Sequence, residues 1–475
     1  MKKRTICIRV ISFLLVFVIL FLLLTEVMQD KRISGEYNPT TKIRGFYAQQ
    51  KNQLDFVFLG SSQVYADIAP GVLWRDFGMT SYDFTANEQP LWITYYYMKE
   101  VLKYQKPKAV VVDVFTAYMD SYMDEGVNHF SLDDMPFSMN KLKAIHASVP
   151  KELRYSYYFT LAKYHTTWMD MNAEKFTAAF RYADDPMKGY SPFVFARSYE
   201  AQAKQEILEQ SGKTEIPEMS RIWIDRMIAL ANEENVPIVF MKTPNGNAER
   251  EMLYNSLEEY FAQKQVSFLN LNEVFDGEAH LNCLQAEKVS QYVGAYLTRH
   301  YPYEDKRGTQ RYEDFERAAV LFDRYRQKCA SVNADDFSGY FASVTNPEQM
   351  IVAITAKGKG SYTNEQLDTL RSLGLEAGLD ETGGNYAALI YDGTVLFEQY
   401  GPDEIQFDTS CKDMAVSVGV GTDEEGETSC FMKLNGHDCS IDLNGFNVVI
   451  YDTMLDEIYE LISFDAAKEY AIVRK

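Results

Sequence analysis

The sequence is poor in the residues from which metal and nucleotide sites are usually built. Its 475 residues include only six histidines and six cysteines, and these do not fall at the short Cys/His spacings of a zinc site. No glycine-rich loop of the kind that holds phosphate groups is present. The chain also has no internal repeat and no low-complexity tract. We therefore expect neither a cofactor nor a bound metal ion.

Positive charge is also scarce. Lys and Arg number 47 against 68 Asp and Glu, which gives a formal net charge of −21. Nucleic acid requires a basic surface, so it is excluded as a partner, and docking on anionic lipid is disfavoured. Contents of 46% apolar and 14% aromatic residues are those of a globular protein. A chain of this length exceeds one ordinary core, so two domains are expected.

The cysteines are too few for a disulfide scaffold. Cys7 lies beside the apolar N-terminal segment, which leaves five cysteines outside it. An odd number leaves at least one free thiol or requires an intermolecular bond. Two alternatives remain open: one local pair among Cys411, Cys430 and Cys439, or thiols that are all reduced.

A single long hydrophobic run extends from Val10 to Leu24. Its length of about 15 residues is short for a membrane span, but flanking residues can extend it. No small-x-small cleavage site follows, so an uncleaved signal anchor (residues 1–28) is favoured over a cleaved signal peptide. The basic residues that precede the run are Lys2, Lys3, Arg4 and Arg9. The positive-inside rule then predicts a single-pass cell-membrane protein whose body is extracytoplasmic.

Strand and helix patterns alternate through most of the chain after the anchor. Such alternation is typical of an α/β domain with a parallel sheet covered by helices on both faces. A long Tyr- and Trp-rich insertion at 130–215 is expected to be helical in pieces. The predicted strands are 54–59, 109–115, 237–241 and 266–271, and the predicted helices are 91–104, 220–235, 248–264 and 282–298.

The texture changes near residue 335, where strands become short and hairpin turns frequent. Asp392-Gly393 and Asn435-Gly436 are tight-turn signals, and Thr363 with Gln366 has the pattern of a helix capping box. We therefore expect a smaller C-terminal α+β, strand-rich domain. The predicted order is a polar stalk (29–53), the α/β domain (54–302), a helical connector (303–334) and the C-terminal domain (335–475).

The most informative stretch is the apolar run from Leu54 that ends in Gly60, Ser61 and Ser62. The run is rich in β-forming residues and stops at a breaker, which predicts a buried strand. A serine at the C-terminal tip of a parallel strand lies where open α/β sheets bind ligands. Ser62 is therefore a candidate nucleophile, although a serine in this place also commonly caps the following turn or helix.

A candidate base stands much later in the chain. His280 precedes a predicted helix and has two carboxylates nearby, Asp276 and Glu278. A serine nucleophile needs a base, and the base needs an acid that orients it. We prefer Asp276 as that acid, with Glu278 as the alternative. The competing interpretation is that His280 is an ordinary surface histidine.

These residues carry a resemblance to a known family. Gly60-Ser61-Ser62 resembles the first block of the SGNH/GDSL hydrolase superfamily, and the segment that ends with His280 resembles the last block. The closer likeness is to membrane-anchored SGNH-like proteins of Gram-positive bacteria, some of which act on teichoic acids and O-acetylated polysaccharides. The resemblance covers roughly residues 40–300. It implies an SGNH-like sheet with Ser62, His280 and Asp276 as the catalytic residues.

The chain departs from the family pattern in the acid and in the second block. Asp276 lies four residues before His280 instead of three, and Gly277 holds the usual acid position. Thr85 stands where the family usually has a glycine whose amide serves the oxyanion hole. A threonine still offers its backbone N–H, but with less conformational freedom.

The block that usually supplies an oxyanion-hole asparagine is absent. Asn87 and Asn245 are alternative replacements. His165, in the aromatic-rich insertion, is expected either to line the substrate cleft or to pack on a helix face against aromatic residues.

The C-terminal domain carries a second resemblance. The segment 444–452, followed by 463–465, is similar to the core signature of the interleukin-like EMT inducer (ILEI)/PANDER domain. Segments 349–355, 363–367 and 386–391 resemble the other half, in the swapped order that a circular permutation gives. The resemblance implies an accessory role in binding glycan or protein.

Together these patterns predict a membrane-anchored SGNH-type serine esterase or O-acyltransferase. Its expected partners are a cell-wall or capsular glycan or its acyl donor, with a membrane acyl-transfer protein as a further expected partner. The alternative is a catalytically inactive SGNH scaffold that serves as a surface binding module, because the acid spacing and Thr85 depart from the family pattern.

Overall fold

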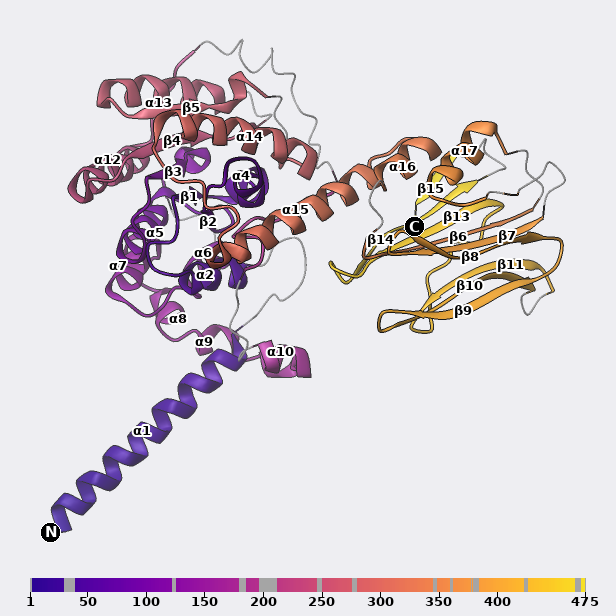
Figure 1. Ribbon diagram of the computed structural model, residues 1–475. Helices are drawn as coiled ribbons and strands as arrows, with labels where there is room; N and C mark the ends of the chain where they lie inside the picture. Colours follow the sequence, from indigo (N-terminus) through magenta and orange to yellow (C-terminus); the bar gives the residue numbers. More distant parts are fainter. Residues whose placement is uncertain are drawn as a thin grey trace. The chain divides into compact units, whose positions relative to one another are not determined.

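The chain divides into two units, Met1–Phe322 and Asp323–Lys475. The computed structural model (Figure 1) describes residues 2–29, 39–121, 125–178, 185–195, 212–245, 250–275, 280–344, 348–358, 362–376, 378, 384–422, 426–465 and 471–474. Each unit is built around its own strands, as the change in sequence texture near residue 335 predicts.

The N-terminal apolar run forms one long helix, α1 (Lys2–Met28). Within the described ranges, Arg4–Met28 is the one helix that is long and apolar enough to cross a membrane. The helix exceeds the predicted run because its flanking residues continue the helical conformation at both ends. The prediction of an N-terminal apolar helix is confirmed, while the side of the membrane on which the body lies stays a prediction.

A five-stranded parallel sheet forms the centre of the first unit. Its order is β2-β1-β3-β4-β5, and β1 pairs with β2 on one side and with β3 on the other. The three central strands are wholly buried because helices cover both faces, which explains their continuous apolar sequences. The strands are β1 (Phe56–Gly60), β2 (Ser81–Thr85), β3 (Ala109–Asp113), β4 (Ile238–Lys242) and β5 (Ser267–Asn270).

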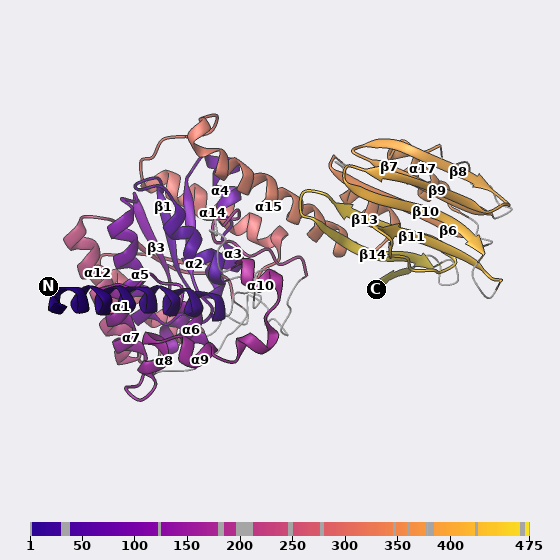
Figure 2. The same ribbon diagram turned by 90° about the horizontal axis from the view of Figure 1, so that it is seen from below.

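Two groups of helices flank this sheet (Figures 1 and 2). One group packs around α5, which contacts α7 and α12, and the other packs around α14, which contacts α3 and α4. The helices are α2 (Pro39–Ala48), α3 (Ser62–Asp67), α4 (Pro70–Phe77), α5 (Leu91–Tyr104), α12 (Glu218–Glu234), α13 (Glu251–Lys264) and α14 (Cys283–His300). The predicted parallel sheet with flanking helices is thus confirmed.

The long insertion after β3 is helical in pieces, as predicted. Its described elements are η1 (Phe115–Tyr118), α6 (Glu125–Leu132), α7 (Met139–Ser148), α8 (Arg154–Tyr158), α9 (Leu161–Tyr164), η2 (Thr167–Asp170) and α10 (Ala173–Ala178). Two features differ from the expectation. β2 was not among the predicted strands, and α2, in the stretch predicted as a stalk, buries Ile43 and Phe46 in the core of the first unit.

The second unit contains two antiparallel sheets. A six-stranded sheet has the order β15-β14-β13-β6-β7-β8, and a four-stranded sheet has the order β12-β11-β10-β9. Both predicted turns are present: Asp392 and Gly393 join β7 to β8 with positive φ, and Asn435 and Gly436 join β11 to β12. The strands are β6 (Met350–Lys357), β7 (Asn385–Tyr391), β8 (Thr394–Gly401), β9 (Ile405–Cys411), β10 (Met414–Thr422), β11 (Thr428–Leu434), β12 (His437–Asp438), β13 (Gly445–Asp452), β14 (Glu457–Asp465) and β15 (Ala471–Arg474).

Alternation along the central strands gives the second unit two cores. On β6, Val352 and Ile354 face the core shared with α16 (Phe337–Ser343) and α17 (Asn364–Ser372), whereas Ile351 faces the four-stranded sheet. The predicted capping box at the start of α17 is formed by Thr363 and Gln366. A strand-rich α+β unit is therefore confirmed.

Helix α15 (Glu313–Val332) crosses the division between the units, and the short η5 (Gln310–Tyr312) precedes it. Its first half belongs to the first unit, where Phe315 is buried and Glu316 accepts a 2.7 Å hydrogen bond from the indole of Trp74. Its second half belongs to the second unit, where Lys328 pairs with Glu457 at 2.9 Å. The helical part of the predicted connector 303–334 thus packs into the core of the first unit through Phe315 and pairs with β14 of the second unit through Lys328.

All six cysteines are free thiols, so the reduced alternative holds. Cys283, Cys329, Cys411, Cys430 and Cys439 are buried, and only Cys7 on α1 is exposed. Burial raises the pKa of the Cys430 thiol to about 11.

Truncation tests how the units divide. We expect a chain ending at Asn333 to keep the stability of the first unit, because it retains all of α15. A matched chain ending at Gly308 should lose roughly 3–5 kcal/mol, because it loses the buried ring of Phe315 and the partner of Trp74. Urea unfolding followed by tryptophan fluorescence measures this unit alone, since all four tryptophans precede Phe322. Equal stability of the two truncated chains would place the division before α15.

Candidate active site

The candidate site is built on the sharp turn between β1 and α3. Ser61 is the N-cap of α3, and its hydroxyl oxygen accepts a hydrogen bond from the N–H of Gln63. Ser62 is the first residue of the helix and is only 4% exposed. Within the described part of the chain its hydroxyl has no hydrogen-bond partner. The capping role considered for Ser62 is therefore filled by Ser61.

Asp113, at the end of the neighbouring strand β3, holds this turn in place. Its Oδ2 accepts hydrogen bonds from the Ser61 hydroxyl at 3.3 Å and from the N–H of Phe115 at 3.1 Å. Gly60 has φ of +145°, and a Cβ there would lie 2.7 Å from the Cβ of Asp113. Only glycine meets both conditions, so Asp113 and Gly60 together determine where the two serines lie.

His280 is far from this turn in the sequence, just before α14, but close to it in space. Its Nδ1 lies 3.1 Å from the side-chain Nε2 of Gln63, the residue that follows Ser62. The imidazole stacks on Phe193, with ring centroids 5.4 Å apart, and lies beside Tyr65 on α3. The next residue, Leu281, donates its N–H to the buried carboxylate of Asp67 at 3.1 Å. The structure thus places His280 beside the turn that carries Ser62.

The Gln63 amide can favour either tautomer of the His280 imidazole, depending on which way the amide faces. When the amide NH₂ faces Nδ1, Nδ1 accepts and the imidazole proton lies on Nε2. An amide rotated by 180° turns its oxygen to Nδ1, so Nδ1–H donates and Nε2 carries no proton. Thr243 can accompany either orientation, because its hydroxyl lies 3.4 Å from the amide oxygen and can donate or accept. Gln63 is therefore suited to orient the imidazole in place of a carboxylate.

Beneath the site lies a buried group of charges at the ends of β3 and β4. Burial raises the pKa of Asp113 to about 6, and burial also lowers the pKa of Lys242 to about 8. The pKa of Asp67 is raised well above its usual range by the same loss of water. Each carboxylate is offset by the Lys242 ammonium, which also lies over the ring of Tyr254. The charge of each of these three groups therefore affects the pKa of the other two.

The residues considered for an oxyanion hole lie on the neighbouring strand end. Thr85 is the last residue of β2 and pairs with Gly60, so it lies one strand spacing from the turn. Asn87 follows in the turn after β2 and is partly exposed. Thr85 is wholly buried, and its side-chain oxygen has no hydrogen-bond partner within the described ranges. Because of its position beside Gly60, Thr85 stays a candidate to donate its backbone N–H to an oxyanion.

The other candidates lie after β4, in the insertion or outside the described residues. Asn245 follows β4, and its N–H donates to Asn272 at 2.8 Å, which ties it to the end of β5. His165 ends α9 in the insertion, where it is exposed and its Nδ1 lies 2.9 Å from the carbonyl oxygen of Ala162. Asp276 and Glu278 fall in 276–279, outside the described residues, so their role as the acid stays a prediction.

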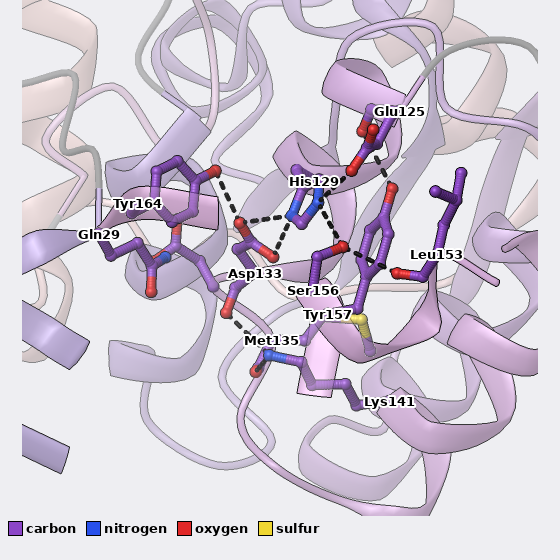
Figure 3. Close-up of polar contacts among 11 residues, drawn as sticks. Gln29, Glu125, His129, Asp133, Met135, Lys141, Leu153, Ser156, Tyr157 and Tyr164 are labelled. Carbon is purple, nitrogen blue, oxygen red and sulfur yellow. Dashed lines mark hydrogen bonds and ion pairs between the residues drawn. The ribbon is translucent and has the colours of Figure 1, made fainter. Parts of the chain in front are cut away.

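A second Ser–His–Asp grouping occurs in the insertion (Figure 3). His129 Nδ1 lies 2.9 Å from both carboxylate oxygens of Asp133, and its Nε2 lies 3.5 Å from the hydroxyl of Ser156. The ring of His129 is buried and stacks on Tyr157 at 3.7 Å. The Ser156 hydroxyl donates to the carbonyl of Leu153 at 2.8 Å, so it is engaged within its own helix. This grouping is arranged to brace helices rather than to meet a substrate.

Groups of three or more metal-ligating side chains are absent from the described part of the chain. No family model, curated protein or solved structure matches this protein. The geometry of the site therefore carries the functional argument by itself.

The buried Asp113 gives the first unit a distinctive pH dependence. Its folded-state pKa of about 6 exceeds the unfolded value, so the folded protein binds this proton more tightly. The free energy of unfolding should therefore fall as pH rises from about 4 to 6, by up to about 3 kcal/mol. We expect Asp113→Asn to lose this contribution and to keep those of Asp67 and Asp83, whose pKa values burial also raises. The variant should stay folded, because its amide oxygen can still accept from Ser61. Urea titrations followed by tryptophan fluorescence at pH 4.5 and 7 measure the difference.

Asp225 provides a matched control with the opposite sign. Partial burial acts to raise the pKa of Asp225, but the hydrogen bond from Lys264 outweighs it, so the pKa is lowered. Asp225→Asn should therefore lower the free energy of unfolding by less than about 1 kcal/mol at pH 7, and by still less at low pH, where the carboxylate is protonated. Parallel pH profiles for the Asp113→Asn and wild-type chains would show that Asp113 is not the titrating group.

Proposed function

We propose that this protein is an SGNH-type serine acyl-transfer enzyme, an esterase or O-acyltransferase, with Ser62 as nucleophile and His280 as base. The observation that carries the proposal is the contact between Gln63 and His280, because it brings together at one strand end two residues that lie 217 positions apart in the sequence. A second observation supports the proposal: Ser61, and not Ser62, supplies the helix cap, so the Ser62 hydroxyl is not needed for capping.

In the proposed reaction, Ser62 Oγ attacks the carbonyl carbon of an ester and its proton passes to His280 Nε2. The C–O bond to the leaving alcohol then breaks, and the alcohol takes this proton, which leaves an acyl-enzyme. Water or a sugar hydroxyl attacks the acyl-enzyme with His280 again as base, and Ser62 recovers its proton. Hydrolysis and acyl transfer share every step but the last.

The negative charge of the tetrahedral intermediate needs N–H donors. The N–H of Ser62 lies in the first turn of α3, where helical N–H groups have no partner within the helix. The backbone of Thr85, next to Gly60 in the sheet, is the proposed second donor. Gln63, Asp276 or Glu278 would orient His280 through Nδ1.

The proposed setting is the outer face of the cell membrane, with α1 as the anchor and four basic residues on the cytoplasmic side. The proposed substrates are acyl esters of a cell-wall or capsular glycan, and the second unit is proposed as an ILEI/PANDER-like accessory domain. The competing proposal is an inactive scaffold that binds glycan or protein. The Gln63 amide at the place of an acid favours that second candidate.

A fluorophosphonate probe distinguishes these proposals because it reacts with an activated serine whatever the substrate. We expect the full-length protein to be labelled and Ser62→Ala to lose labelling by about a thousandfold or more. Ser62→Ala should remain folded, because the hydroxyl it removes has no partner among the described residues.

Two serine variants serve as matched controls for this labelling. Ser156→Ala removes the serine of the second Ser–His–Asp grouping and should be labelled like the unmodified chain. Ser61→Ala should cost about 1 kcal/mol of stability through the lost helix cap, with labelling retained. Absence of labelling in the unmodified chain would favour the inactive scaffold, and loss of labelling in Ser156→Ala alone would move the active site to the insertion.

Substitution of Gln63 tests how His280 is oriented. Gln63→Leu should lower kcat/KM for a small acetyl ester about 10- to 100-fold, because the imidazole loses its hydrogen bond. Gln63→Glu should keep activity and move the acidic limb of the pH–rate profile to higher pH, since a carboxylate beside Nδ1 raises the imidazole pKa. If Gln63→Leu is as active as the unmodified enzyme, Asp276 or Glu278 orients His280 instead.

A further inference from the structure

The insertion carries an unusual concentration of exposed apolar side chains. Outside α1, eight large apolar side chains of the described residues are at least half exposed, and five of them lie between residues 155 and 176. These five are Tyr155, Phe159, Trp168, Met169 and Phe176. A patch of this kind on a soluble surface marks an interaction site. We call this group, together with Leu161, the apolar foot.

The apolar foot adjoins the N-terminal helix. Helix α9 contacts α1, and Figure 1 shows α8, α9 and α10 beside the C-terminal end of α1. Phe159, Leu161 and Ala162 line one side of an open groove of about 570 Å³, and Phe17 and Phe21 of α1 line the other. Through Phe159 and Leu161 the foot therefore adjoins the apolar surface of α1.

The position of this groove along α1 fixes its depth. Leu24 is the last residue of the apolar run, and a helix rises about 1.5 Å per residue. Phe21 and Phe17 thus lie about 4.5 and 10.5 Å inside the apolar run. When α1 spans a bilayer, Phe159 and Leu161 lie at the same depth, which is the depth that interfacial membrane segments reach.

Polar contacts hold the foot rigidly against the end of α1. Asp134 accepts hydrogen bonds from Gln29, just after α1, and from Arg44 on α2, and Arg44 also pairs with Glu26 of α1 at 2.6 Å. The adjacent Asp133 binds Tyr164 of α9 at 2.8 Å (Figure 3). Helix α9 therefore cannot move away from the end of α1 without breaking this network.

The same network accounts for the second Ser–His–Asp grouping. His129 joins Asp133 to α8 through its stacking on Tyr157 and its approach to Ser156 (Figure 3). Lys141 of α7 donates to the backbone oxygens of Asp133 and Met135. These contacts link α6, α7, α8 and α9 into one support for the apolar foot.

We infer that the apolar foot is a second membrane contact, which inserts among the phospholipid acyl chains of the leaflet that faces the body. Phe159 and Leu161 enter the acyl region, and Trp168 lies at the interface, where tryptophan is favoured. The groove lining is apolar on both sides, which suits acyl chains. This inference rests on the proposed anchoring by α1 and is independent of the ester chemistry.

Quenching of tryptophan fluorescence by brominated lipid tests the inference on the full-length protein. The protein is reconstituted in phosphatidylcholine vesicles whose acyl chains carry bromine at a shallow or a deep position. Trp168→Phe serves as background, because the three remaining tryptophans are no more than 5% exposed. One tryptophan is then added at Phe159, at Phe17 as the anchor control, or at Tyr292 on α14 as an exposed control outside the foot.

We expect Phe159→Trp to be quenched within about twofold of Phe17→Trp and most strongly by the shallow bromine. Native Trp168 should also be quenched by the shallow bromine, and Tyr292→Trp should not be quenched by either. Quenching at Phe17 without quenching at Phe159 would overturn the inference and leave the anchor intact, as a partner helix or solvent would then cover the foot. Absence of quenching at Phe17 would overturn both. Ester hydrolysis by the same vesicles reports the proposed function separately.

Discussion

The first unit depends on one buried carboxylate. Asp113 lies at the centre of the sheet edge, where it accepts hydrogen bonds from Ser61 and Phe115 and occupies the space that a side chain at Gly60 would need. Burial of a carboxylate is unfavourable, and the raised pKa of Asp113 expresses this cost. The geometry of the strand-to-helix turn, and with it the direction of Ser62, is fixed by a group that would be more stable in water. Buried groups with shifted pKa values are common at functional sites.

Buried contacts also fix the position of His280. His280 lies just before α14, and the described residues around it hold it at two neighbouring points. Asp67 binds the N–H of Leu281, and Phe193 and Tyr65 enclose the imidazole. These partners come from α3 and from the later part of the insertion. The site is therefore assembled from parts of the chain that can meet only when the whole first unit has folded.

Sequence patterns predicted the elements whose burial is periodic. Helix α5 has the predicted bounds, and four of the five parallel strands were expected because their residues are continuously apolar. β2 was missed because it includes Ser81 and Asp83, polar residues that are buried only through tertiary contacts. Gln63 was missed because no local pattern marks an amide that meets a histidine 217 residues away. The roles of Asp276 and Glu278 stay predictions, and so do the family resemblances that suggested them.

The buried thiols have a consequence for how this chain matures. A protein exported to an oxidising compartment usually needs either disulfides or protection from them. Here five cysteines lie within the two folded units, and burial raises the pKa of Cys411, Cys430 and Cys439, so little reactive thiolate forms. Folding outside the cytoplasm would therefore need no oxidant, but it would have to finish before the thiols are oxidised. The amount of native protein would then depend on how fast the chain folds relative to how fast its thiols are oxidised.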